Sequence, residues 1–263
     1  MDSADFVDPY LDPQTGILRN LVGATTREAL NAAEGALTVA RAMQLMDKPQ
    51  AASNDLTELR EIHRRLFGDV YAWAGQLRTV DIRKPDGEPF LPVSMIERAA
   101  DFAVGELRAD GLLRQMERAQ FIERLAYHYD SVNYIHPFRE GNGRTQRVFW
   151  NRVARDAGWQ LDWQTVQGRT NDAACRAAAE ERDFGPLRVM FESIAEPIPV
   201  GRTTHPGWPA QELGRLSMGA STDEHRERSR RDVAARIDHR IEGEEAVGGG
   251  AEERRPPRTG PAR

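Results

Sequence analysis

The residues best suited to chemistry in this chain lie together in the stretch HPFREGNGRTQR, from His136 to Arg147. It combines a histidine that can act as a general base, a carboxylate that can bind a metal ion, and glycines that expose backbone N–H groups to an anion. Two arginines can also grip phosphate oxygens. This set suits the transfer of a phosphate-containing group to a hydroxyl, which needs a base, charge neutralisation and in-line placement.

Each residue type has an expected role in such a reaction. His136 is the candidate catalytic base, because an imidazole is partly neutral near pH 7. Glu140 is the candidate ligand of Mg²⁺, a cation that prefers oxygen ligands and bridges phosphates. The residues expected to hold the phosphates are Gly141, Asn142, Gly143, Arg144 and Arg147.

The elements around the stretch should place these side chains on a loop. Pro137 keeps His136 out of the α-region, so the preceding helix should end there. The residues from Arg144 onward are typical of a helix, and the glycines before it remove the Cβ atoms that would block an anion. A helix N-terminus opened by glycines is an anion-binding site.

The stretch resembles the signature of the Fic (filamentation induced by cAMP) family, H-x-F-x-[D/E]-G-N-G-R-x-x-R, at every fixed position. The segment LFGDVYAWAGQLR, residues 66–78, looks like the part of that family that leads into its target-binding flap. The resemblance covers roughly residues 10–195. It implies an all-α, mainly helical Fic fold with a small β-hairpin flap.

The resemblance also implies an activity: transfer of AMP from ATP, with Mg²⁺, to a Ser, Thr or Tyr hydroxyl of a target protein, with release of pyrophosphate. Family members that act as kinases resemble the death-on-curing toxin and carry a lysine in place of the second glycine. Gly143 therefore favours AMP transfer. Members that use CDP-choline or UTP share the core motif, so the motif leaves the nucleotide base open.

A hairpin is expected between residues 79 and 91. The short apolar runs 79–82 and 88–91 flank Lys-Pro-Asp-Gly, a sequence that suits a tight turn. By shape alone this is an ordinary solvent-exposed hairpin. The resemblance implies that it binds an extended target segment by strand addition. The flap residues expected to do so are Val80, Asp81, Ile82, Arg83 and Lys84.

Apolar periodicity predicts helices over residues 25–43, 55–67, 94–111, 118–135, 171–179 and 186–194, besides the one that follows the motif. Residues 159–169 are expected to be a connector. We expect His63 to be a surface or helix-packing histidine, because no matched motif reaches it. The aromatic stripe of the 118–135 helix is expected to pack in the core.

Composition favours a cytoplasmic protein with no direct nucleic-acid binding. The formal net charge is −5, which argues against a broad basic footprint. The chain has one cysteine, its first residues do not read as a signal peptide, and no segment approaches the roughly 20 apolar residues that span a bilayer. We therefore expect no membrane partner.

Two regions are expected. Residues 1–199 should form the Fic domain with an N-terminal helical extension. Residues 200–263 have almost no large apolar side chains and should form a disordered, charged tail. A short helix over 223–241 is plausible on the spacing of its few apolar residues.

Fic enzymes that modify proteins are commonly inhibited by a helix bearing [ST]-x-x-x-E-[GN]. The nearest matches here, Glu34 and Glu242, are preceded by Leu30 and Asp238 in place of Ser or Thr. The sequence therefore predicts a toxin whose small, separate antitoxin supplies a glutamate against Arg147. Glu34 remains open as a degenerate inhibitory residue.

Two alternatives belong to other classes. One is a catalytically silent Fic-fold interaction protein, against which the intact His136, Glu140, Arg144 and Arg147 count. The other is a secreted effector whose tail is a transport signal.

Overall fold

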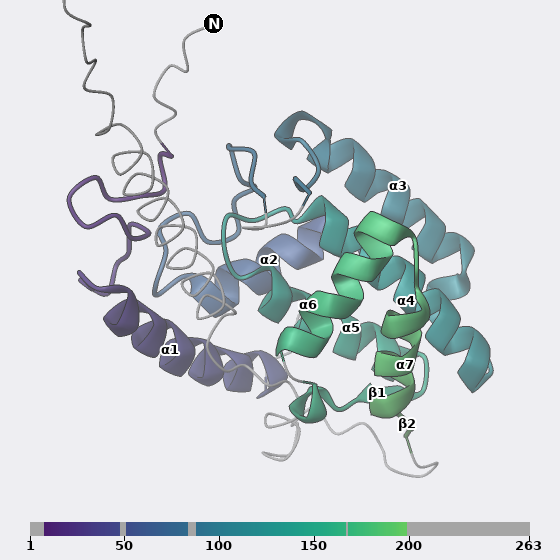
Figure 1. The fold of residues 1–263 in the computed structure, drawn as a ribbon. Coiled ribbons are helices and arrows are strands. Elements are labelled where there is room, and N and C mark those ends of the chain that lie inside the picture. The colour runs from purple at the N-terminus through teal and green to yellow at the C-terminus, as the bar shows by residue number, and fades with distance from the viewer. Residues whose placement is uncertain (1–7, 48–50, 84–87, 167, 199–263) are drawn as a thin grey trace, which may run out of the picture. The chain divides into compact units, whose positions relative to one another are not determined.

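Helices dominate the residues described by the computed structural model, which are 8–47, 51–83, 88–166 and 168–198 (Figure 1). They are α1 (Arg27–Asp47), α2 (Leu56–Phe67), α3 (Ile96–Ala109), α4 (Arg118–Ile135), α5 (Asn142–Asp156), α6 (Gly168–Arg176) and α7 (Gly185–Ile194). Short 3₁₀ turns span Val93–Met95, Gly111–Leu113 and Trp163–Thr165, and a π-helical turn spans Ala177–Glu181. The predicted mainly helical fold is confirmed.

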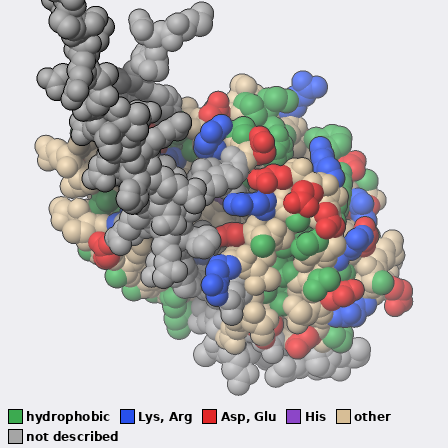
Figure 2. Space-filling model, viewed as in Figure 1, with side chains coloured by type: hydrophobic (Ala, Val, Ile, Leu, Met, Phe, Trp, Pro, Cys, Tyr) green, Lys and Arg blue, Asp and Glu red, His purple; other side chains and the backbone are tan. Residues whose placement is uncertain are grey.

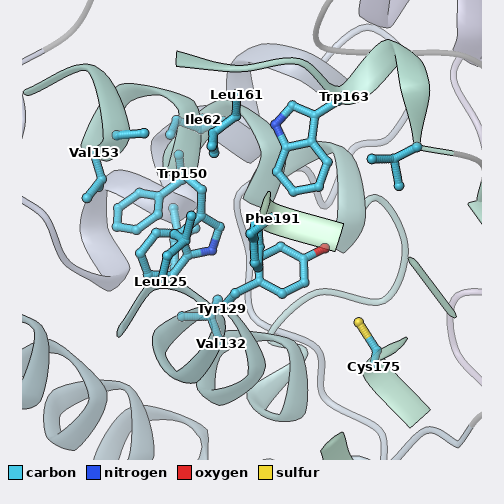
Figure 3. Packing of buried hydrophobic residues seen from close by; sticks show 14 of the residues in the cluster. Ile62, Leu125, Tyr129, Val132, Trp150, Val153, Leu161, Trp163, Cys175 and Phe191 are labelled. Carbon is cyan, nitrogen blue, oxygen red and sulfur yellow. The ribbon is translucent and has the colours of Figure 1, made fainter. Parts of the chain in front are cut away.

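The helices pack around a main core that includes α4, and α3 also contributes to a second, smaller apolar cluster. The predicted aromatic stripe of α4 is buried, with Phe121 and Leu125 fully inaccessible to solvent. Figure 3 shows Leu125 of α4 among side chains from other helices, including Ile62 of α2, Trp150 of α5 and Phe191 of α7. Burial of such large apolar side chains is the main stabilising contribution to folding. This packing holds the end of α4 and the start of α5 in place, and the motif loop lies between them.

The structure adds a two-stranded sheet that the sequence did not predict, and one of its strands lies inside the predicted connector over residues 159–169. β1 (Trp159–Leu161) pairs antiparallel with β2 (Ala195–Pro197), and Gln160 lies opposite Glu196. Strands of three residues are too short to show an alternating pattern, so the prediction was wrong here. The sheet joins the chain after α5 to the end of α7.

Several predicted helix bounds differ from the observed ones by one to four residues, most of all in α1 and α6. α1 continues four residues beyond the predicted Met43, to Asp47. α6 begins at Gly168, three residues before the predicted start at Asn171. α2 begins as expected after Asp55, whose side chain accepts a hydrogen bond from the Glu58 N–H at 3.2 Å.

The predicted hairpin is present as two antiparallel arms. Arg83 and Pro89 form an isolated bridge, and the Phe90 N–H donates to the Ile82 carbonyl at 3.1 Å. Residues 84–87, which include the predicted flap residue Lys84, lie outside the described part. So do the tail over 200–263 and its predicted short helix over 223–241.

The face seen in Figure 2 carries charge of both signs. Acidic and basic side chains are interspersed among apolar ones over its described part. Within the residues described, no helix has the length and apolar character needed to cross a membrane.

Candidate active site

The motif forms a loop between α4 and α5. α4 ends at Ile135, and His136 then adopts the left-handed conformation with φ 45° and ψ 62°. Its N–H still donates to the Val132 carbonyl at 3.2 Å. The predicted end of the helix before Pro137 is thus confirmed, and the imidazole begins the loop. A non-glycine residue in this conformation is uncommon, and such residues cluster at functional sites.

Hydrogen bonding fixes the tautomer of His136. Its Nδ1 lies 3.1 Å from the Asn133 carbonyl oxygen, which can only accept a hydrogen bond. Nδ1 therefore carries the proton in the neutral ring, and Nε2 carries the lone pair that a general base needs. The Phe90 ring stacks on the imidazole with centroids 3.7 Å apart and planes 16° apart. The flap thereby contacts the candidate base directly.

A side chain would have different consequences at the two glycines of the motif. Gly141 has φ +81°, and a Cβ there would lie 2.5 Å from the Phe67 ring. A Cβ on Gly143 would meet nothing within 4 Å. Gly141 is thus required by the fold. Gly143 borders open space at the N-terminus of α5, where an anion would meet backbone N–H groups.

Asn142 braces the loop from within. Its Oδ1 accepts from the Phe138 N–H at 2.9 Å, and its Nδ2 donates to the Phe138 carbonyl at 2.8 Å. Phe138 itself is fully buried, which anchors the loop in the core. The amide of Asn142 keeps one further hydrogen, so its predicted contact with a phosphate stays a prediction.

Glu140 is suited to bind Mg²⁺ together with a nucleotide. Its Oε1 accepts from the Gly141 N–H at 2.9 Å and lies 3.9 Å from Nη2 of Arg144. No cluster of three His, Cys, Asp or Glu side chains that could hold a metal ion occurs among the described residues. Mg²⁺ is commonly held by one or two carboxylates plus substrate phosphates, so a single glutamate beside a phosphate cradle fits this ion.

Arg144 is held by a residue of α1, the first helix that the structure describes. It forms a buried salt bridge with Glu34 of α1, and the Tyr71 hydroxyl donates to the same carboxylate. Burial raises the pKa of Glu34, while the Arg144 charge acts in the opposite direction. Nη1 of Arg144 is buried with no hydrogen-bond partner among the described residues. A phosphate oxygen would satisfy this donor.

Arg147 faces a different wall of the site. Its guanidinium lies over the Trp163 ring, 5.5 Å from the ring centroid. Burial lowers its pKa, and the positive charge of Arg144 acts in the same direction. Arg144 and Arg147 lie on one turn of α5, as the sequence predicted. Their side chains have different partners: Arg144 contacts Glu34 of α1, and Arg147 contacts Trp163 in the 3₁₀ turn after β1.

Arg78 contributes to the site although the sequence analysis assigned it no role. Its buried guanidinium donates to the His136 carbonyl at 2.9 Å, to the Val80 carbonyl at 2.9 Å, and to the carbonyl of Leu91. Burial lowers its pKa. Because Val80 and Leu91 lie at the two ends of the hairpin, one side chain fastens both ends to the loop. Its place two residues before the flap was the available signal.

His63 also has a contact with the site that the sequence analysis did not give it. It is fully buried and donates from Nε2 to the Glu140 carbonyl at 2.9 Å. The signal was its position four residues after Leu59, on the apolar face of α2. The helix-packing part of the prediction is correct, but the residue also contacts the motif loop.

Comparison with known proteins agrees with this geometry. The profile of the Fic/DOC family matches residues 53–154. The chain is 37% identical over 187 residues to the Fic protein of Escherichia coli (strain K12), described as a probable protein adenylyltransferase. This match covers 71% of this chain and 92% of that protein. The chain is also 40% identical over 160 residues to the protein adenylyltransferase VbhT of Bartonella schoenbuchensis. That match covers 61% of this chain and 33% of VbhT.

Solved structures give the same result. The BepC protein of Bartonella tribocorum, crystallised with bound AMPPNP, superposes with a TM-score of 0.69 at 25% identity, over 72% of this chain and 97% of that one. The sequence and structure comparisons point to the same family. The chain therefore belongs to the Fic/DOC family, among the protein adenylyltransferases of the Fic type.

Proposed function

We propose that this chain transfers AMP from ATP to a Ser, Thr or Tyr hydroxyl of a target protein. The observation that carries the proposal is the orientation of His136, whose Nδ1 is bonded to the Asn133 carbonyl so that Nε2 holds the lone pair. The base lies on the same loop as the open space beside Gly143. The loop thus joins a proton acceptor to a phosphate site.

In the proposed reaction, Nε2 of His136 takes the proton of the target hydroxyl. The hydroxyl oxygen forms a bond to the α-phosphorus of ATP, the bond from that phosphorus to the bridging oxygen breaks, and pyrophosphate leaves. Arg144 and the backbone N–H groups at the start of α5 stabilise the charge on the phosphates. Mg²⁺ held by Glu140 would neutralise charge on the same oxygens.

The position of the transferred phosphate tests this proposal. With Mg²⁺, the purified protein is expected to transfer label from α-³²P-ATP, but not from γ-³²P-ATP, to a protein of a cell lysate. The reason is the absence of a side chain at Gly143, which leaves room for the AMP-transfer pose. Label arriving only from the γ position would mean that the protein is a kinase, and AMP transfer would be wrong.

We further propose that the flap aligns the target by strand addition. Ile82→Pro removes one backbone donor from the first arm of the hairpin and does not change the sequence of the motif loop. Modification of the target is expected to fall far more than self-modification, measured by label incorporation into each. Equal loss of both would show that the hairpin serves only the fold. Ile82→Ala is the matched control, because it changes the same side chain and keeps the backbone donor.

A toxin with a separate antitoxin is the proposed biological role. Its support is the sequence, in which neither Glu34 nor Glu242 has the full inhibitory motif. The structure adds that Glu34 contacts Arg144, whereas the expected antitoxin glutamate would act on Arg147. Growth of cells that express the chain, with and without small proteins encoded beside it, tests the role. Relief of toxicity by such a partner is the supporting result.

A translocated effector is the second candidate. The observation in its favour is that solved relatives are described as VirB-translocated Bartonella effectors, including BepC. Delivery of a reporter fused to residues 200–263 into a second cell would support it.

A further inference from the structure

His63 lies beneath the motif loop and contacts it through its ring as well as its nitrogen. The ring stacks on Phe138 of the motif, with centroids 4.0 Å apart and planes 21° apart. Trp73, in the segment that leads to the flap, lies 5.9 Å away on the same measure. The imidazole is fully buried. It therefore adjoins both the motif loop and the segment before the flap.

Two backbone groups determine the tautomer of His63. The Gly75 N–H can only donate, so Nδ1, 2.8 Å away, must accept. Nε2 then carries the proton and donates to the Glu140 carbonyl at 2.9 Å. Burial lowers the pKa of His63 to about 4, so the ring is neutral near pH 7. One neutral ring thus makes two directed hydrogen bonds to segments 65 residues apart (Gly75 and Glu140).

The bond to Glu140 acts on a peptide unit that matters for nucleotide binding. The carbonyl of Glu140 and the N–H of Gly141 belong to the same planar peptide. That N–H donates to the Glu140 carboxylate at 2.9 Å. Fixing the carbonyl therefore fixes the N–H that orients the carboxylate, and with it the backbone entering α5.

We propose that His63 is a positioning residue for the nucleotide-binding loop, acting through the Glu140–Gly141 peptide. The proposal rests on the proposed function, because it assigns the loop a role in holding ATP. A purely packing histidine would need only its volume and its stacking on Phe138. A positioning histidine needs the Nε2–H bond in particular.

The two hydrogen bonds of His63 can be removed one at a time. Glutamine places an amide N–H where Nε2–H lies, so His63→Gln can keep the bond to Glu140 and lose the one to Gly75. Asparagine places its oxygen where Nδ1 lies, so His63→Asn can keep the bond to Gly75 and lose the one to Glu140. Each variant is a control for the other, and His63→Ala removes both.

The first readout is catalytic. ATP affinity by calorimetry and kcat for AMP transfer are measured on protein whose Tm has been determined. His63→Asn is expected to lower kcat or ATP affinity by about tenfold to a hundredfold, as misplaced reacting groups do. His63→Gln should stay within about threefold of the wild type, a difference too small to reflect lost orientation. Equal loss in both variants, or no loss in His63→Asn, would overturn the proposal.

The second readout does not depend on the activity. Hydrogen exchange of the Gly141 and Asn142 amides is expected to be faster in His63→Asn than in His63→Gln, and exchange of the Gly75 amide should show the reverse order. If the wild type transferred no AMP, the proposed function would fail while this pattern still decided the role of His63. Similar exchange in both variants would show that the residue acts by packing alone.

Discussion

His136→Ala is expected to lower the rate of AMP transfer by about a hundredfold or more while ATP binding stays nearly unchanged. The imidazole acts on the incoming hydroxyl, and its Nδ1 bond to the Asn133 carbonyl orients Nε2 for that task. The imidazole also stacks on the Phe90 ring of the hairpin. Single-turnover transfer and calorimetric ATP binding, measured on the same preparation, separate the two effects.

Glu140→Ala is the matched comparison, because it changes the same loop in a different role. We expect it to weaken nucleotide binding only when Mg²⁺ is present, since a carboxylate that serves the ion has little to bind without it. If His136→Ala weakened ATP binding as much as it lowered transfer, the imidazole would be a phosphate contact and its assignment as base would be wrong.

Glu34→Ala is expected to destabilise the fold by about 3–5 kcal/mol, because it leaves the buried Arg144 without its closest carboxylate. It also removes the acceptor of the Tyr71 hydroxyl. AMP transfer should fall with it, since Arg144 loses the partner that orients its guanidinium toward the loop. Urea unfolding and label transfer measure the two effects.

Glu28→Ala makes the same change at an exposed position of α1 and should leave both quantities within the range of ordinary surface substitutions, about 0.5 kcal/mol in stability. A gain of activity in Glu34→Ala, instead of the expected loss, would contradict the prediction. A large gain of activity from Glu34→Ala would show that Glu34 is a built-in inhibitor, and the proposal of a separate antitoxin would have to be abandoned.

The sequence predicted the parts of the site that are local. Pro137 after His136 ends the preceding helix as predicted. The helix after the motif is also present, but it begins at Asn142, so that Gly141 is its N-cap and Gly143 lies in its first turn instead of before it. The spacing of apolar residues predicted the helices, with bounds within four residues of the observed ones, for the same reason. Periodicity is a property of the segment itself.

What the sequence did not predict depends on residues far apart along the chain. Glu34 and Arg144 are 110 positions apart, and no local pattern says that their side chains meet. The strands β1 and β2 exist only because the chain after α5 returns beside the end of α7. A buried polar residue such as His63 shows its role only once its hydrogen-bond partners are known.

The salt bridge between Glu34 and Arg144 also bears on what can be separated from this protein as a working module. The region shared with the family profile begins at residue 53, whereas Glu34 lies on α1 before it. A fragment cut at that boundary would retain the complete motif but lack the carboxylate that pairs with Arg144. We therefore expect the smallest stable fragment that keeps this site to include α1 as well as the motif helices.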